Sequence, residues 1–555
     1  MGHDRELLVT GGPIWSGWPE LPRPEALLVR DGRVVAMGTR LEVESQLGGP
    51  HQSLDLRGRA LLPGFHDAHC HPIGGGLQQR NCDLDGAPTA ADCQRRVAAY
   101  LARHPATDWV VGSGWSMETF PRGTPPHQLL DPVTGAHPAF LTNRDGHSAW
   151  VNQVALERAG INRNTPDPPH GRIERDPQGR PQGTLHEAAM DLVGRLVPAP
   201  STEELTAALL QAQAHLHQLG IVGWQDAAVD PAGEAAYSLA ASRGALTARV
   251  RLALWWQRER GLDQVPELVA RRSQLRQHGL DAGTVKLMLD GVMETYTAAL
   301  LEPYQNPPAT AHPEGASGHL FLEPEEARAA VVELDRQRFQ VHFHAIGDRA
   351  VRVALDAVAD ARVTHADGDG PWPRHHIAHL QLIDPADLGR FANLAVVANI
   401  QPFWACHEPQ MDELTIPYLG AGRSRRQYPF RSLLDRGATL AAGSDWPVST
   451  ADPLQEIAVA VRRVTPALAR GGAPALAPFL PEQRISLQEA FDAFTRGSAF
   501  VSQLEREGGC LAPGRWADLV VLAEDPFRLE PDQLPAARVE LTMVGGTIVY
   551  DRGTV

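Results

Sequence analysis

The sequence predicts an α/β protein built around a (β/α)8 TIM barrel, with a small β-sandwich formed by both chain ends and an insert after the first barrel strand. Two observations lead to this prediction. Short apolar segments alternate with helix-like segments along the chain, as parallel βα units do. Polar residues gather at the carboxyl ends of the apolar segments, where the active sites of such barrels lie. A doubly wound parallel sheet is the alternative, because it shows the same alternation.

Eight apolar segments are predicted as barrel strands. In chain order they are Leu61–His71, Ile221–Ala227, Arg249–Trp256, Thr284–Asp290, Gln340–Ala345, His376–Gln381, Ala395–Gln401 and Thr439–Asp445. The clearest predicted helix between them runs from Ser201 to Leu219, because Ser201 and Glu204 have the spacing of a capping box. Apolar residues recur at helical spacing in two further segments, Glu323–Arg338 and Asp348–Ala361.

Three regions differ in their patterns, and we interpret them as domains. The barrel is expected to take residues 61–77 and 201–504. Residues 78–200 interrupt the repeat and are rich in Pro, Gly, His and Trp, so we interpret them as an inserted subdomain on the substrate side. Residues 1–60 and 505–555 both carry short strands separated by glycine turns, and we expect these ends to pair into one small β-sandwich.

The composition excludes several classes of function. Lysine and arginine number 51 against 66 acidic residues, so the net charge is −15, and neither nucleic acid nor a membrane is an expected partner. The five cysteines show no CxxC pairing, and no secretory leader or membrane span is recognisable. We therefore expect a cytoplasmic protein that acts on a small molecule. A homodimer is the expected assembly, because it is a common state of such barrels.

Two histidines at the end of the first predicted strand suggest a metal site. His69 and His71 are two residues apart in a Pro-Gly-Phe-His-Asp-Ala-His-Cys-His run, so on a strand they face the same side. Two imidazoles on one face can share a metal ion. With 23 histidines in the chain, such a pair also arises by chance. Cys70 would face the opposite side and pack against other residues.

The ends of other predicted strands carry further candidate ligands. Lys286 lies among apolar residues in the fourth strand, where it must pair, for example with Asp290, or be modified. Carboxylation by CO2 would make it an anionic oxygen ligand that can bridge two metals. The fifth, sixth and eighth strands add His344, His379 and Asp445, with His342 and His376 nearby as supporting or packing residues. Each has a packing explanation on its own, but their coincidence at so many strand ends favours one site.

The sequence resembles the amidohydrolase superfamily, and most closely its YtcJ-like branch, which includes N-substituted formamide deformylases. The resemblance spans nearly the whole chain. It rests on Pro63–His71, Gly114-Trp115, Arg144–Asn152, Gly183–Glu187, Lys286 with Asp290-Gly291, His344–Asp348, His379, Gly443–Pro447 and Gly509–Leu522. It implies that the metal ligands are His69, His71, Lys286, His344, His379 and Asp445. It also implies about two divalent ions per chain, expected as Zn2+, and N6-carboxylated Lys286.

The chemistry expected from this resemblance is hydrolysis of an amide- or formamide-type C–N bond by metal-activated hydroxide. Asp445 would take a proton and deliver it to the leaving nitrogen. His147 or His344 would stabilise the oxyanion, although His147 also has a structural explanation. The tryptophans expected to line the substrate pocket, unless they are core residues, are Trp115, Trp150 and Trp446.

Two alternatives are left open by the sequence. The nearest alternative is deamination of an aminated heterocycle. Deaminases of this superfamily carry a Glu three residues after the fifth-strand histidine, where this chain has Gly347, followed by Asp348, so amide hydrolysis is preferred. A lyase, a decarboxylase or a non-catalytic metal binder on the same barrel is also compatible with the residues. The branch usually has Glu before the sixth-strand histidine, whereas this chain has Ala378, which indicates a different contact and a different substrate.

Overall fold

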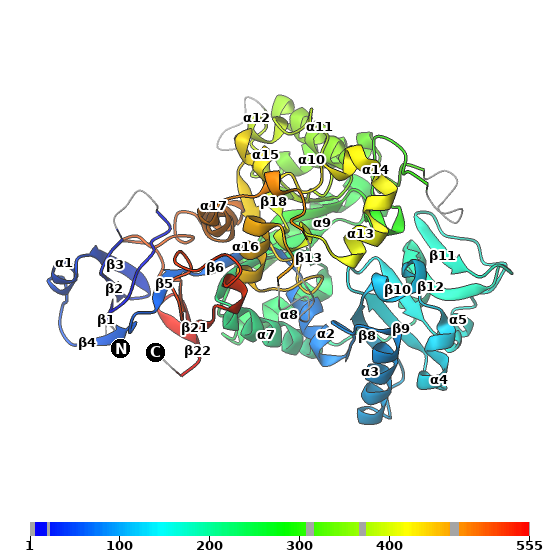
Figure 1. The fold of residues 1–555 in the computed structure, drawn as a ribbon, viewed down its shortest axis with the longest axis horizontal. Coiled ribbons are helices and arrows are strands. Elements are labelled where there is room, and N and C mark those ends of the chain that lie inside the picture. Colours follow the sequence, from blue (N-terminus) through cyan, green and yellow to red (C-terminus); the bar gives the residue numbers. More distant parts are fainter. Residues whose placement is uncertain (1–5, 19–22, 307–315, 366–372, 467–476, 554–555) are drawn as a thin grey trace.

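The computed structural model describes the chain except residues 1–5, 19–22, 307–315, 366–372, 467–476 and 554–555 (Figure 1). In the described part, eight parallel strands form one sheet that curls into a barrel. In spatial order they are β6 (Phe65–Cys70), β13 (Ile221–Val229), β14 (Arg249–Trp255), β15 (Asp281–Met288), β16 (Gln340–Ala345), β17 (His376–His379), β18 (Val397–Ile400) and β19 (Leu440–Ala442). Each lies within or overlaps a predicted strand, so the predicted barrel is confirmed.

The first predicted strand, Leu61–His71, is divided in the structure. β5 (Ala60–Pro63) pairs antiparallel with β20 (Leu519–Leu522) in the β-sandwich, and β6 then begins the barrel. The break falls at Gly64, where an added Cβ would lie 2.3 Å from Cγ1 of Val222. Because only glycine fits this close passage, the chain can leave one sheet and enter the next here.

The barrel closes between β6 and the segment after β19, and this seam carries two candidate ligands. The backbone N–H of Asp445 donates to the carbonyl of His69 over 2.7 Å. The Asp67 carboxylate accepts from the backbone N–H of His69 at 2.9 Å and of Ser444 at 3.1 Å. These bonds hold the backbones of His69 and Asp445 side by side.

Helices surround the barrel (Figure 1). α7 (Thr202–Gln218) begins at the predicted capping box, in which Ser201 and Glu204 each accept a hydrogen bond from the other's backbone. The other helices between and after the barrel strands are α8 (Pro231–Ser242), α9 (Val265–Gln277), α10 (Pro324–Arg336), α11 (Asp348–Thr364), α12 (Arg390–Asn393), α13 (Pro409–Leu414), α14 (Ile416–Ser424), α15 (Phe430–Asp435), α16 (Pro453–Arg462), α17 (Leu487–Asp492) and α18 (Ser498–Val501). Within the described residues, no helix is long and apolar enough to cross a membrane.

The insert forms a sheet of its own beside the barrel (Figure 1). Its strands, in spatial order, are β11 (Gly171–Arg175), β12 (Pro181–Glu187), β10 (Ser148–Val151), β9 (Ala139–Asn143), β8 (Val110–Trp115) and β7 (Cys82–Asp83). Its helices are α3 (Ala90–Arg103), α4 (Asp131–Thr134), α5 (Gln153–Arg158) and α6 (Asp191–Gly194). The preceding helix, α2 (Pro72–Arg80), follows β6 and packs against α7 of the barrel. Trp115 and Trp150 lie in the apolar core of the insert, so the insert has a hydrophobic centre separate from that of the barrel.

The two chain ends form the predicted β-sandwich, and both termini lie there (Figure 1). One sheet has the order β3 (Arg33–Gly38), β2 (Ala26–Arg30), β1 (Glu6–Thr10) and β4 (His51–Asp55), with α1 (Arg40–Glu44) beside it. The other has the order β22 (Thr547–Asp551), β21 (Val539–Val544), β20 and β5. Val29, Leu519 and Met543 share one core, so side chains from opposite ends of the chain join the two sheets.

Candidate metal centre

All six side chains that the resemblance implies as metal ligands line one cavity at the carboxyl end of the barrel. The cavity measures about 850 Å3, and strands β8 and β9 of the insert form part of its wall. The six residues are His69, His71, Lys286, His344, His379 and Asp445. They lie at or just after the carboxyl ends of five barrel strands, β6, β15, β16, β17 and β19, which explains how residues far apart in sequence meet here.

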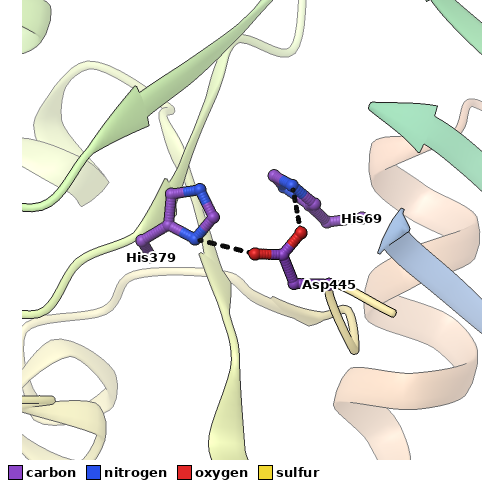
Figure 2. A group of neighbouring side chains, drawn as sticks. All are labelled: His69, His379 and Asp445. Atoms are coloured by element: carbon purple, nitrogen blue, oxygen red, sulfur yellow. Dashed lines mark ion pairs between the residues drawn. The ribbon is translucent and has the colours of Figure 1, made fainter. Parts of the chain in front are cut away.

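His69, His379 and Asp445 form the tightest group (Figure 2), with one ligand atom from each lying within 4.8 Å of the others. The Asp445 carboxylate lies 3.2 Å from Nε2 of His69, 3.8 Å from Nδ1 of His379 and 3.0 Å from Nε2 of His71. Nε2 of His69, Nδ1 of His379 and Oδ1 of Asp445 are buried without a hydrogen-bond partner among the described residues. Such atoms are costly to bury alone, and a divalent cation would satisfy all three.

Neighbouring groups fix which nitrogen of a ligand ring faces the cavity. Nδ1 of His69 lies 2.8 Å from Nε2 of His342, a hydrogen bond that leaves Nε2 of His69 for the metal. Nε2 of His344 donates to the carbonyl of Gly291 over 3.2 Å, which leaves Nδ1 of His344 for the same purpose. His342 therefore orients the ring of His69 through the hydrogen bond to its Nδ1, and it does not itself line the cavity.

Lys286 is the only lysine in the chain, and every other member of the 51 basic residues is arginine. Its side chain is buried, and burial lowers the pKa of its amine to about 7. The pairing with Asp290 that the sequence allowed is not formed. Asp290 instead accepts hydrogen bonds from the backbone N–H groups of Ala299, Ile346 and Gly347. Lys286 therefore lines the cavity without an ion pair to Asp290.

The insert adds a charged pair to the cavity. Nδ1 of His147 lies 3.0 Å from the carboxylate of Glu187, and both residues line the cavity. Burial acts to lower the pKa of the His147 ring, but the Glu187 carboxylate outweighs it and raises this pKa to about 9. The ring lies 5.6 Å from that of His344, between centroids. Glu187 was missed as a site residue, although it ends the Gly183–Glu187 motif that the resemblance singled out.

The tryptophans are placed differently from the sequence interpretation. Trp115 and Trp150 are fully buried in the insert core, and their indole N–H groups donate to backbone carbonyls. Trp446 lines a neighbouring cavity of about 550 Å3 instead. Trp255, Trp256 and Trp404 line the cavity of the ligands. Trp404 also lines the neighbouring cavity and stacks on His379 with 5.3 Å between centroids. It follows the seventh predicted strand by three residues, a position that marks it as a candidate.

Three further positions bear on the type of reaction. An added Cβ at Gly347 would lie 2.0 Å from the carbonyl oxygen of Ala299, so the position of the deaminase glutamate does not admit a side chain. Asp348, the next residue, accepts from the backbone of Leu301 and lines a separate surface cavity. Ala378 is fully buried opposite His344 in the strand pair β16–β17. None of these three positions provides an acid to the cavity.

The profile of the amidohydrolase family matches residues 52–550. The chain belongs to the amidohydrolase family. This amidohydrolase is 31% identical to the putative amidohydrolase YtcJ of Bacillus subtilis, over 98% of this chain and 99% of the relative. It is 26% identical to the N-substituted formamide deformylase of Arthrobacter pascens, over 100% of this chain and 99% of the relative. The resemblance drawn from the motifs is confirmed.

A solved structure supports the fold of this amidohydrolase. The crystal structure of an uncharacterized metal-dependent hydrolase from Pyrococcus horikoshii superposes with a TM-score of 0.71 and 24% sequence identity. The match covers 95% of this chain and 99% of that one, so sandwich, barrel and insert all have counterparts.

Proposed function

We propose that this amidohydrolase is a metal-dependent enzyme that hydrolyses an amide- or formamide-type C–N bond of a small molecule. The observation that carries the proposal is the group of buried ligand atoms on His69, His379 and Asp445, which lie close together and make no hydrogen bond among the described residues. Imidazole and carboxylate donors suit zinc among the available divalent metals. With His71, Lys286 and His344 included, the donors are sufficient for about two ions.

The residues of the cavity divide the work of hydrolysis. A divalent metal held by the histidine and carboxylate ligands would lower the pKa of a water molecule and would polarise the scissile carbonyl. The Asp445 carboxylate takes the proton of the attacking water and passes it to the leaving nitrogen, which must be protonated to depart as an amine. Nε2–H of the His147 imidazolium donates to the oxygen of the carbonyl as negative charge develops on it.

Lys286 is proposed to be carboxylated. Its amine forms an N–C bond with CO2 and releases a proton, which yields a carbamate with one negative charge. Three facts support this: Lys286 is the only lysine, it is buried at the cavity wall, and Asp290 is engaged elsewhere. A guanidinium group does not react in this way, so arginine is not equivalent at this position.

The single lysine makes this proposal directly testable by NMR. Protein supplied with 13C-bicarbonate should give a carbamate carbon signal that is absent from the K286R variant. K286R keeps the positive charge and approximate length of the side chain, so it controls for binding of bicarbonate elsewhere, including at the N-terminal amine. A signal of equal size in both proteins, or in neither, would show that Lys286 is not carboxylated.

The cavity supports an N-substituted amide over an aminated heterocycle. Its volume of about 850 Å3 exceeds the needs of a formyl group and leaves room for a large substituent on nitrogen. The full-length similarity to an N-substituted formamide deformylase favours the same bond type. Deamination is disfavoured because Gly347 has no space for the glutamate that the superfamily deaminases carry at this point.

A substrate panel tests the proposed function. Metal-loaded protein should release amines from some N-formyl, N-acyl or cyclic amides and no ammonia from aminated heterocycles. The D445N variant, purified in the same way, controls for contaminating hydrolases and should release neither. Ammonia release without amide turnover would replace the proposal with deamination.

A further inference from the structure

We infer that Glu187 is a positioning residue for the proposed hydrolysis, fixing the His147 ring with Nδ1 toward the insert and Nε2 toward the metal centre. The inference rests on the function proposed above. It concerns a side chain of the insert whose role the sequence motifs did not predict. Glu187 does not itself reach the ligands and acts through His147, with which it shares a hydrogen bond of 3.0 Å.

The pairing of two insert strands brings Glu187 and His147 together. β10 and β12 run antiparallel, with Ser148 directly opposite His186. One residue further along, the N–H of Glu187 donates to the carbonyl of His147 over 3.0 Å. Because side chains alternate between the faces of a strand pair, His147 and Glu187 share the cavity face. The adjacent residues in sequence, Ser148 and His186, share the other face.

Contacts with the barrel hold the Glu187 carboxylate in place. The hydroxyl of Thr297 donates to Oε1 of Glu187 over 2.8 Å. At Gly291 an added Cβ would lie 2.5 Å from the same oxygen, so only glycine lets the carboxylate approach. The carbonyl of Gly291 in turn accepts from His344, a candidate metal ligand. Glu187 therefore fixes the insert against the barrel loop that also orients a ligand.

The backbone of Glu187 supports a functional interpretation. Its φ is +50°, a conformation that side chains of L-residues rarely adopt. Such strain persists where the surroundings over-determine the residue and is frequent at functional sites. The hydrogen bonds to His147 and Thr297 are the contacts that offset this strain.

A second histidine–glutamate pair in the same sheet of the insert, with His186 on β12 and Glu174 on β11, provides a matched control. Nε2 of His186 lies 3.1 Å from Oε1 of Glu174, and Nδ1 lies 2.7 Å from the hydroxyl of Ser148. Arg172 also donates to Glu174, over 2.8 Å. His186, Glu174 and Ser148 are buried, and none of them lines the cavity. The two pairs have similar chemistry, but only the pair of His147 faces the proposed reaction.

A double-mutant cycle tests the inference. E187Q should lower kcat about 10- to 100-fold, the usual cost of losing a group that orients an active-site residue. H147Q should lower kcat by about 100-fold or more, as the loss of one oxyanion donor does. E187Q combined with H147Q should be no slower than H147Q alone, because Glu187 acts only through His147. E174Q should turn over substrate like the wild type.

Two results would overturn the inference. One is a full additional loss of kcat from E187Q in the H147Q background. The other is equal losses in E187Q and E174Q, which would indicate a structural effect. If the wild type turns over no substrate, the proposed function fails instead. The placement of the His147 ring by Glu187 is then tested by 15N-histidine NMR. The Nδ1–H signal of His147 should shift in E187Q and not in E174Q, and an unchanged signal in E187Q would contradict the inference.

Discussion

The barrel mouth and the insert contribute to the same cavity by different means. The barrel places its six candidate ligands on strand ends, where the alternation of side chains fixes their direction. The insert places His147 and Glu187 through the docking of a separate sheet, which depends on contacts with Thr297 and Gly291. In the proposed hydrolysis, the barrel would carry the metal ligands and the insert would carry the pair that faces the carbonyl oxygen of the substrate.

The two regions also differ in how their polar atoms are satisfied. In the described part of the barrel mouth, Nε2 of His69, Nδ1 of His379 and Oδ1 of Asp445 make no hydrogen bond. In the insert, His147 and Glu187 satisfy each other at 3.0 Å. Loss of a barrel group should therefore affect the metal or the chemistry directly, whereas loss of an insert group should leave the metal content unchanged.

The largest effect is expected at Asp445, on the barrel side. D445N should keep its metal, because an amide oxygen can still ligate, and should lose turnover by about 10³-fold, since proton transfer is removed. Kinetics and elemental analysis of the same sample would measure both quantities. D348N is the matched control, since Asp348 lies outside the cavity, and it should keep its turnover. Full activity in D445N would remove Asp445 from the mechanism.

Replacement of the single lysine should have the next largest effect. K286R should lower turnover by at least about 100-fold and reduce the metal content from about two ions per chain to about one, because the proposed carbamate ligand cannot form. Elemental analysis and steady-state kinetics would measure this. Unchanged metal content together with unchanged turnover would show that the barrel ligands hold the metals without Lys286.

A smaller effect on metal binding is expected at His342, which hydrogen-bonds to the candidate ligand His69 without lining the cavity. H342F removes the hydrogen bond to Nδ1 of His69 and should weaken metal binding about 10- to 100-fold, as the loss of such an orienting group does. H342Q keeps an acceptor and should bind metal more tightly than H342F. Competition with a chromogenic chelator would measure both affinities. Equal affinities in the wild type and H342F would show that His69 needs no orienting partner.

The smallest effect concerns the boundary between the two regions. Burial, with Asp145 of the insert nearby, raises the pKa of Glu294 to about 7 from its ordinary 4.5. The folded state therefore keeps this proton more tightly than the unfolded state, and the stability it contributes is lost as pH rises through about 7. E294Q should gain on the order of 1–2 °C in Tm over the wild type at pH 8, and less at pH 5. A difference in Tm that does not vary with pH would contradict this.

The ligands and the barrel were predictable because both follow from local rules. Strand alternation sets the direction of His69 and His71, and parallel strands bring their carboxyl ends together. The split at Gly64 was not predictable, because Leu61–Pro63 and β6 are buried alike and their apolar pattern does not show which sheet each joins. For the same reason the sequence did not distinguish Trp115, in the insert core, from Trp404, beside the ligands.

The contribution of the insert depends on tertiary contacts. The position of His147 at the cavity requires β10 to pair with β12 and Glu187 to reach Thr297 of the barrel. These partners are separated by up to 110 positions in sequence, and no periodicity links them. The motifs around His147 and Glu187 therefore marked candidate residues without revealing that they act as a pair.

The central claim is that turnover depends on metal held at the barrel mouth, and one chelation titration tests it most directly. Metal content and amide turnover are measured together while the purified protein is depleted with chelator and then reloaded with Zn2+. Both quantities should fall together from about two ions per chain, and turnover should return with the metal. Turnover that persists in protein without bound metal would contradict the account.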